Sequence, residues 1–304
     1  MIEFLNIGTK IELIKVNKKT MKIKIKKTNI KLTAILLLCA VGLSSFAILQ
    51  KEETNVPTDT SVFKHRTMTN DAFTLGEKLN YRVHYGIINA ANITMKIDDK
   101  FTNYKEKENY HINITGYTLK AFDWMFKVRD QFDSYVEKNR IAPMKFTKKV
   151  RENKYKDVDY AVFAPEQSKI YTQKAKGGSL KTKAGYTYDI ASALLYTRNI
   201  DFSKAKVGDT YPINVYLDNT IYELSFRFDG RETIKSDVGK VKCIKLVPKL
   251  VVDRVFGEEE AMTVWVSDDK NKIPVRVKAD LKVGSIKVDL TSYSGLKNTF
   301  SSKS

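Results

Sequence analysis

Apolar and polar residues alternate along most of this chain from Phe73 onward, and this alternation limits the folds open to it. A period of two puts successive side chains on opposite faces of an extended strand, so each run indicates a strand with one buried face. The first run places Lys78, Asn80, Arg82 and His84 on its polar face. Its apolar face comprises Leu79, Tyr81, Val83, Tyr85 and Ile87.

Further runs repeat the pattern towards the C-terminus, at residues 91–97, 110–114, 158–162, 213–217, 222–228, 264–266, 273–277 and 286–290. In the run at 158–162, Val158, Tyr160 and Val162 are expected on the buried face. Short turns separate many of the runs, and the first is expected near Asn89. Strands linked this closely must be mostly antiparallel, because parallel neighbours need a crossover of about a dozen residues or more.

Two segments break the alternation. Residues 119–128 (LKAFDWMFKV) are rich in aromatics and suit one or two helical turns, and residues 188–199 (YDIASALLYTRN) carry apolar residues at helical spacing. Thr187 or Asp189 can cap the second segment. One short helix cannot cover both faces of about ten strands, so the sheet must curl on itself. We therefore expect a mainly β fold, an antiparallel meander curled into a barrel or half-barrel with one or two short helices.

Residues 21–47 have the three parts of a secretory signal peptide: a Lys-rich start, an apolar run, and small residues before a cut expected after Ala47. The apolar run of about twelve residues is shorter than a spanning helix needs. A retained membrane anchor at residues 32–49 is the alternative. Leu38 is bulkier than the residue that precedes a lipidated cysteine, so we do not expect lipidation of Cys39. Cleavage would leave Cys243 alone, without an internal disulfide.

The leader divides the chain into expected segments. Residues 1–20 add nothing that a leader requires, so we expect them to be a gene-start artefact, with translation beginning at Met21. Residues 48–70 are polar and predict a flexible tether. A single β-rich domain is expected over residues 71–297, with a tail at 298–304. Export and cleavage would deliver a soluble protein to the periplasm of a Gram-negative bacterium.

The net charge of +18 comes partly from the leader, since residues 1–47 hold nine Lys and two acidic residues. The remainder has 44 basic and 33 acidic residues, or +11. Such a charge favours acidic surfaces such as anionic lipid head groups or acidic polysaccharide. The alternative is a set of scattered, solvated lysines, because no five-residue basic block follows the leader. We expect no nucleic-acid partner, and membrane contact that is at most peripheral.

Motifs that indicate catalysis are missing from the sequence. His65, His84 and His111 are spread over the tether and two strands, whereas a metal site needs three or four convergent ligands. Ser203 and Lys206 match the S-x-x-K spacing of acyl-transfer enzymes, but they lie in a polar segment without the companion motifs. We expect no catalytic residue, metal or cofactor.

Three stretches together resemble the domain-of-unknown-function 3108 family of exported bacterial proteins. They are FTLGEKLNYRVHYGIINAANITM at 73–95, YDIASALLYTR at 188–198 and WVSDDKNKIPVRVKADLKVGSI at 265–286, and the similarity would span residues 70–297. The resemblance implies a curled antiparallel sheet, similar to the half-barrels of lipoprotein-carrier and capsule-locus envelope proteins. It implies no reaction and no binding residues.

The sequence leaves three functions open. The first is a non-enzymatic periplasmic binding or assembly factor whose curled sheet holds a lipid, a lipid-linked glycan or another envelope component. The second is a module that docks another envelope protein through sheet edges or the aromatic patch around Phe122, Trp124 and Phe126. The third is a hydrolase of cell-wall carbohydrate or peptide. Arg129 and Arg198 lie beside aromatic segments and are candidates for contacting an anionic ligand, with ordinary ion pairs as the alternative.

Overall fold

The structure, a computed structural model, describes residues 63–124, 126–182, 185–249, 262–281 and 284–304, together with three short strands near the start of the chain. Those strands are β1 (Phe4–Asn6), β2 (Thr9–Glu12) and β3 (Lys24–Lys27), which pair in that order as a small antiparallel sheet. The apolar part of the leader, the expected cleavage site after Ala47 and residues 48–62 lie outside the described residues.

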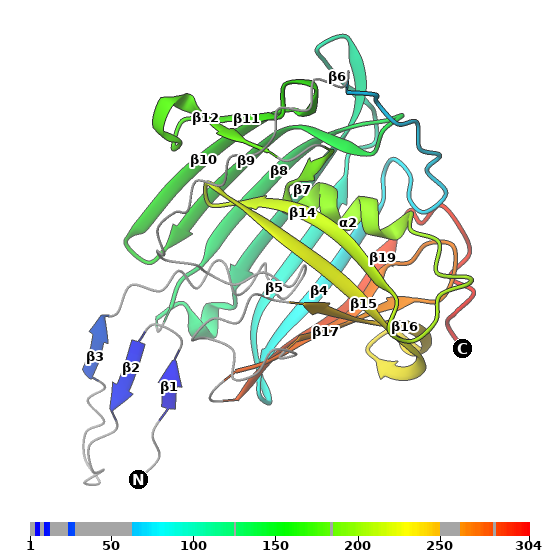
Figure 1. The fold of residues 1–304 in the computed structure, drawn as a ribbon. Coiled ribbons are helices and arrows are strands. Elements are labelled where there is room, and N and C mark those ends of the chain that lie inside the picture. The colour runs from blue at the N-terminus through cyan, green and yellow to red at the C-terminus, as the bar shows by residue number, and fades with distance from the viewer. Residues whose placement is uncertain are drawn as a thin grey trace, which may run out of the picture.

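The other strands form one 16-stranded sheet in the order β12-β11-β10-β9-β8-β7-β5-β4-β19-β18-β17-β16-β15-β14-β13, with β6 paired to β7. Every neighbouring pair is antiparallel except β13 with β14. The sheet curls strongly (Figure 1), which confirms the expected fold class. The strands are β4 (Lys78–Tyr85), β5 (Ile88–Ile97), β6 (Thr102–Tyr104), β7 (Lys107–Thr118), β8 (Arg129–Glu137), β9 (Ala142–Glu152), β10 (Tyr155–Ala164), β11 (Lys169–Thr172), β12 (Ser179–Lys181), β13 (Thr187–Tyr188), β14 (Thr210–Leu217), β15 (Thr220–Ser236), β16 (Gly239–Lys249), β17 (Met262–Ser267), β18 (Pro274–Asp280) and β19 (Ser285–Ser294).

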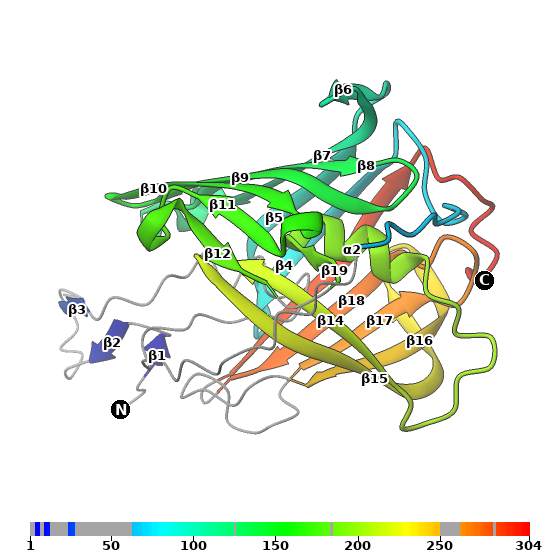
Figure 2. The ribbon, with the colours of Figure 1, turned by 45° about the horizontal axis from the view of Figure 1, so that its top comes forward.

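A nine-residue helix, α2 (Ile190–Arg198), lies inside the curl of the sheet (Figures 1 and 2). Asp189 is its N-cap, and the carboxylate accepts from the backbone N–H groups of Ala191 and Ser192 at 2.9 and 3.0 Å. The Ser134 hydroxyl of β8 donates to the other carboxylate oxygen at 2.7 Å. The cap therefore also anchors α2 to the sheet. Burial raises the pKa of Asp189 to about 6.

The other expected helical segment, residues 119–128, forms a single 3-10 turn, η1 (Lys120–Phe122), within the connection from β7 to β8. Two similar turns, η2 (Pro165–Gln167) and η3 (Lys176–Gly178), flank β11.

The buried faces of the first strands agree with the alternation, up to the tip of the hairpin. Leu79, Tyr81 and Val83 are buried in β4, as are Ala91, Ile93, Met95 and Ile97 in β5. The turn, however, comes earlier than expected, at Gly86 and Ile87 rather than near Asn89. Gly86 has a positive φ of 57°, which suits it to a tight hairpin turn. Ile87 was expected on the buried face but is 99% exposed, because it occupies the turn itself.

The expected orientation of β10 was wrong. Val158 and Tyr160 face solvent, whereas Asp159, Ala161 and Phe163 are buried. The reason is a partner outside the strand. The Tyr216 hydroxyl of β14 donates to a carboxylate oxygen of Asp159 at 3.0 Å, so a polar residue is satisfied on the inner face.

The two ends of the sheet meet through side chains rather than through strand pairing. Besides donating to Asp159 of β10, the Tyr216 hydroxyl lies 3.3 Å from Oγ1 of Thr172 in β11. Lys148 of β9 forms an ion pair with Asp218 in the turn between β14 and β15. In the parts of the chain that the structure describes, no strand ladder closes the circle. The result is a nearly closed half-barrel.

The segments bordering the domain pack against it, although both were expected outside it. The Arg66 guanidinium, in the last part of the expected tether, donates to the carbonyls of Arg140 and Ile141 at 2.8 to 3.1 Å. In the expected tail, the Ser302 hydroxyl donates to Asp269 at 2.8 Å. The ordered domain thus includes residues 63–70 and 298–304.

Candidate functional site

Consecutive strand pairs turn at one end of the sheet, which we call the rim. The β9–β10 turn lies at Asn153, the β7–β8 connection spans residues 119–128, and the β4–β5 turn lies at Gly86 and Ile87. The backbone N–H of Leu119 donates to the carbonyl of Ala90 at 3.0 Å, so the β7–β8 connection lies against the start of β5. Both features are at the lower left of the sheet in Figure 1.

An ion pair holds the β7–β8 connection in shape. Arg129 donates to both carboxylate oxygens of Asp123, at 2.6 and 3.1 Å. The Thr118 hydroxyl donates to the same carboxylate at 2.7 Å and accepts from the backbone N–H of Val128 at 3.1 Å. These hydrogen bonds, that of Arg129 above all, hold the pKa of Asp123 below its usual range. The two ends of the connection are therefore tied together.

The aromatic residues of this connection have different environments. Phe126 packs against the main hydrophobic core, and its backbone N–H donates to the carbonyl of Phe122 at 2.9 Å. Phe122 is half-buried, whereas Trp124 is 73% exposed. Met125 lies outside the described residues. Phe126 thus anchors a loop that displays Trp124.

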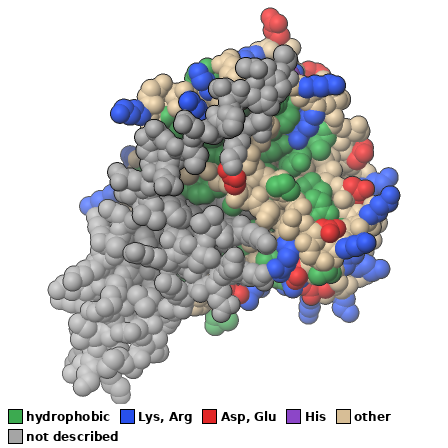
Figure 3. Space-filling view, viewed as in Figure 1, with side chains coloured by type: hydrophobic (Ala, Val, Ile, Leu, Met, Phe, Trp, Pro, Cys, Tyr) green, Lys and Arg blue, Asp and Glu red, His purple; other side chains and the backbone are tan. Residues whose placement is uncertain are grey.

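Other apolar side chains stand in solvent near Trp124. Ile87 and Ile88 are 99% and 46% exposed at the β4–β5 turn, and Tyr117 is 40% exposed at the end of β7. The Asn92 amide donates to the Tyr117 hydroxyl at 3.2 Å, which links β7 to β5. We call Ile87, Ile88, Tyr117 and Trp124 the rim patch. In Figure 3 hydrophobic side chains protrude at the lower edge, where Figure 1 places the β4–β5 turn.

Exposed lysines accompany the rim patch. Lys120 and Lys127 belong to the same connection as Trp124, and Lys154 and Lys156 lie at the β9–β10 turn. None of the four pairs with an acidic side chain among the described residues. Two acidic residues of the rim are already engaged or buried, Asp123 with Arg129 and Glu152 on the inner face. The β7–β8 connection and the β9–β10 turn therefore place exposed basic side chains beside the rim patch.

Arg198 does not join this site. It is buried, and its two Nη atoms donate to the carboxylate oxygens of Glu77 at 2.5 and 2.8 Å. Its Nε and Nη2 also donate to the carbonyls of Asn271 and Ala72. The sequence left two roles open for Arg198, contact with an anionic ligand or an ordinary ion pair. In the structure Arg198 forms an ion pair. This pair ties the end of α2 to Glu77, which directly precedes β4.

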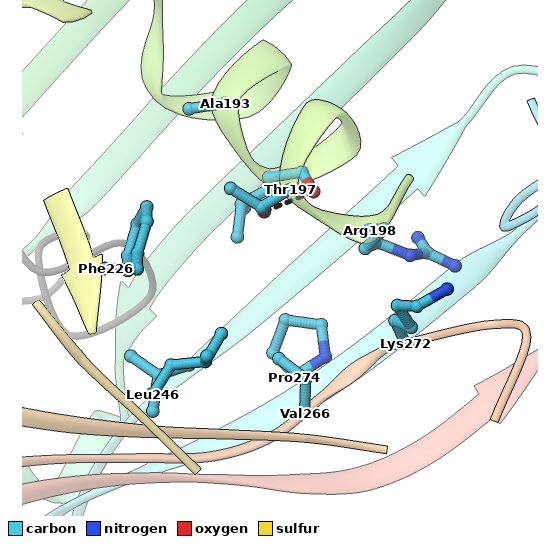
Figure 4. A pocket seen from close by; sticks show the side chains of 10 residues that line it. Ala193, Thr197, Arg198, Phe226, Leu246, Val266, Lys272 and Pro274 are labelled. Atoms are coloured by element: carbon cyan, nitrogen blue, oxygen red, sulfur yellow. Dashed lines mark hydrogen bonds between the residues drawn. The ribbon is translucent and has the colours of Figure 1, made fainter. Parts of the chain in front are cut away.

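Two small cavities lie between α2 and the described strands of the sheet. A cavity of about 30 Å³ lies between Leu194 and the inner face of β15 to β17, and an apolar one of about 20 Å³ lies beside Tyr81. In Figure 4, Phe226 and Leu246 face Thr197 across the first cavity, whereas the charged ends of Arg198 and Lys272 point away from Phe226. Each cavity has room for about one or two waters. A lipid chain would need far more space.

A polar cleft of about 190 Å³ opens at the end of the sheet opposite the rim. Lys105, Lys107 and Arg140 line it together with Glu137 and Tyr186. Arg140 is already paired with Glu137 at 3.0 Å. Sequence reasoning missed this cleft, because its residues come from separate turns and share no motif.

The side chains with reactive groups, among them His111, Ser203 and Cys243, do not lie together in one site. His111 lies on the outer face between Asp98 and Asp133, whose carboxylates are 2.7 and 3.1 Å from its ring nitrogens. Ser203 lies in an exposed turn. Burial raises the pKa of the Cys243 thiol to about 12. Within the described ranges no three His, Cys, Asp or Glu side chains are grouped so that they could hold a metal ion.

Comparisons with known proteins identify the family. The sequence pattern of DUF3108, described as a protein of unknown function, matches residues 80–291. The chain belongs to this family. The match lies within the 70–297 span expected from the sequence motifs and confirms that resemblance. No curated protein matches the chain.

Solved structures with similar architecture come from several bacteria. A β-barrel-like protein of the DUF1849 family from Brucella abortus is 10% identical with a TM-score of 0.49, covering 75% of this chain and 100% of that one. A candidate lipoprotein from Parabacteroides distasonis is 10% identical with a TM-score of 0.32, covering 76% and 100%. A candidate exported protein with a YmcC-like fold from Bacteroides fragilis is 10% identical with a TM-score of 0.32, covering 73% and 97%. Among the described residues, no helix is long and apolar enough to cross a membrane.

Proposed function

We propose that the chain is a non-enzymatic binding factor of the bacterial envelope that contacts its partner through the rim patch. The observation that carries the proposal is the exposure of Trp124 on a connection that is fixed from both sides. Arg129 and Thr118 hold Asp123, and Phe126 packs into the core. A large aromatic side chain held in solvent by a rigid support is typical of a binding surface. The envelope location rests on the signal-peptide pattern at residues 21–47.

A carrier that encloses its ligand is less well supported. The cavities under α2 are about 30 and 20 Å³, whereas ligand sites in proteins usually measure about 300 Å³ or more. A hydrolase is also less well supported, because it needs convergent acid and base groups in a cleft. The carboxylates of Asp98 and Asp133 instead both contact His111 on the outer face of the sheet.

Site-specific crosslinking in the native host tests the proposal. A photoreactive phenylalanine analogue is placed at Trp124 in one strain and at Val207 in another. Val207 is a matched control, because it is apolar and 70% exposed but precedes β14 at the end opposite the rim. We expect crosslinks to an envelope protein or lipid from position 124 and none from position 207. Equal crosslinking at both positions, or none at position 124, would contradict the proposal.

A further inference from the structure

We infer that the partner of the rim patch is an anionic lipid surface, on which the protein docks peripherally through the β4–β5 turn and the β7–β8 connection. This inference rests on the proposed function, because it assumes that the rim is the binding surface. It names the partner as a lipid surface rather than a protein.

The first argument is the chemistry and placement of the apolar side chains. The apolar side chains of the rim patch lie at adjacent connections at one end of the sheet. Such a placement suits a partner whose surface is locally flat. Trp and Tyr have apolar rings with a polar group, which suits them to the boundary between lipid head groups and acyl chains. Ile87, at the tip of its turn, can extend into the acyl region without moving the sheet.

The second argument is charge. Lys120 and Lys127 lie on the same connection as Trp124, and Lys154 and Lys156 lie at the neighbouring β9–β10 turn. Among the described residues none of the four forms an ion pair, although the charge of Lys127 helps to lower the pKa of Asp123. An anionic membrane surface attracts each basic residue close to it, by enough to strengthen binding about fivefold per residue. Two rim carboxylates do not oppose this attraction, because Asp123 is paired with Arg129 and Glu152 is turned inward.

The two tryptophans of the chain provide a sharp test. Trp124 lies in the rim patch, whereas Trp265 lies on β17 and donates to Glu232 at 2.7 Å. In the Trp265→Phe protein the fluorescence comes from Trp124 and therefore reports the rim alone. In the Trp124→Phe protein it comes from Trp265, which serves as the control away from the rim. The protein is purified from its host after export, so that no uncleaved Lys-rich leader binds the vesicles, and is mixed with vesicles of phosphatidylcholine, with or without phosphatidylglycerol. The emission maximum and quenching by brominated lipid are then measured.

We expect the emission of Trp124 to shift to shorter wavelength only with vesicles that contain phosphatidylglycerol. The emission of Trp265 should stay unchanged.

Replacing Lys120 and Lys127 together by Ser should weaken binding roughly 25-fold, from the fivefold effect per residue. Ile87→Ser should reduce the shift without reducing the folded fraction, because Ile87 is 99% exposed.

No shift with either vesicle, or an equal shift with both, would overturn the inference. The crosslinking experiment separates this failure from a failure of the proposed function. A protein crosslinked at position 124 together with no vesicle shift would leave the rim as the binding surface and reject the lipid. The absence of both signals would reject the rim itself.

Discussion

At the scale of single residues, polar side chains that are buried and paired with one another stabilise the fold. Arg198 and Glu77 are both buried and paired, and removing one partner of such a pair typically costs about 3–5 kcal/mol. Neither residue was identified from the sequence as part of the core. Their positions are 121 residues apart, so no local pattern connects them.

His111 gives a testable effect of pH on stability. The hydrogen bond to Asp133, followed by that to Asp98, raises its pKa above the ordinary histidine value of 6.5. A raised pKa in the folded state means that protonated His111 stabilises the fold. This contribution is complete below pH 6.5 and is lost as the pH rises through the folded pKa.

We expect His111→Gln to lower the free energy of unfolding by on the order of 1 kcal/mol at pH 5.5. The difference from the unchanged protein should shrink towards pH 8.5. Urea unfolding of both proteins across this range measures it. A difference that stays constant with pH would contradict the assignment.

At the scale of elements, the connection from β7 to β8 is held in shape by side chains at its two ends. Its aromatic content suggested one or two helical turns, and one 3-10 turn forms. The bonds from Thr118 and Arg129 to Asp123 close the connection from its two ends. These bonds join side chains from the two ends of the connection, and the composition of the segment does not reveal such pairing.

Arg129→Ala should loosen this connection with little effect on the rest of the domain. Arg129 is partly exposed, so the loss of its ion pair should change the free energy of unfolding by less than about 1 kcal/mol. The fluorescence anisotropy of Trp124, measured in the Trp265→Phe background, should fall.

Lys138→Ala is the matched control for Arg129→Ala, because it removes an exposed ion pair, with Glu108, at the opposite end of the sheet. It should leave the anisotropy unchanged. An equal fall in both variants would show that the Arg129–Asp123 pair does not hold the connection.

At the scale of the whole molecule, side-chain contacts join the two ends of the curled sheet. Backbone pairing between described strands does not join them. Tyr216 on β14 contacts Asp159 on β10 and Thr172 on β11, and Lys148 pairs with Asp218. These contacts join β14 to the strands at the other end of the sheet, and α2 lies inside the curl (Figure 2). The contacts that join the two ends of the sheet therefore also hold its curved shape around α2.

Removing the Tyr216 hydroxyl tests this closure. Tyr216→Phe leaves the buried carboxylate of Asp159 without that donor, which should cost about 1–3 kcal/mol in the free energy of unfolding. Amide hydrogen exchange should become faster in β14 and the start of β15 and stay unchanged in β4 and β5. Tyr171→Phe is the control, because its hydroxyl contacts Gln167 on the exposed surface. Uniformly faster exchange across the sheet would argue against a local closure.

The sequence by itself indicated nine strands of the large sheet, their mostly antiparallel pairing and the position of α2. These follow from local causes: alternation with period two, short turns, and the Asp189 cap. It also identified the aromatic segment with Trp124 as a candidate binding surface. The same local rule placed Val158 and Tyr160 on the wrong face, because it assumes that polar residues point to solvent.

Only the tertiary structure decided which polar residues are buried and where the sheet ends meet. Asp159 faces inward because Tyr216, 57 residues later, supplies its hydrogen bond. Arg198 lies in the core because Glu77 balances its charge there. Such partners come together only when the curled sheet brings distant strands side by side. The rim patch depends on strand pairing instead, since the pairing of β5 with β7 brings the two connections to one end of the sheet.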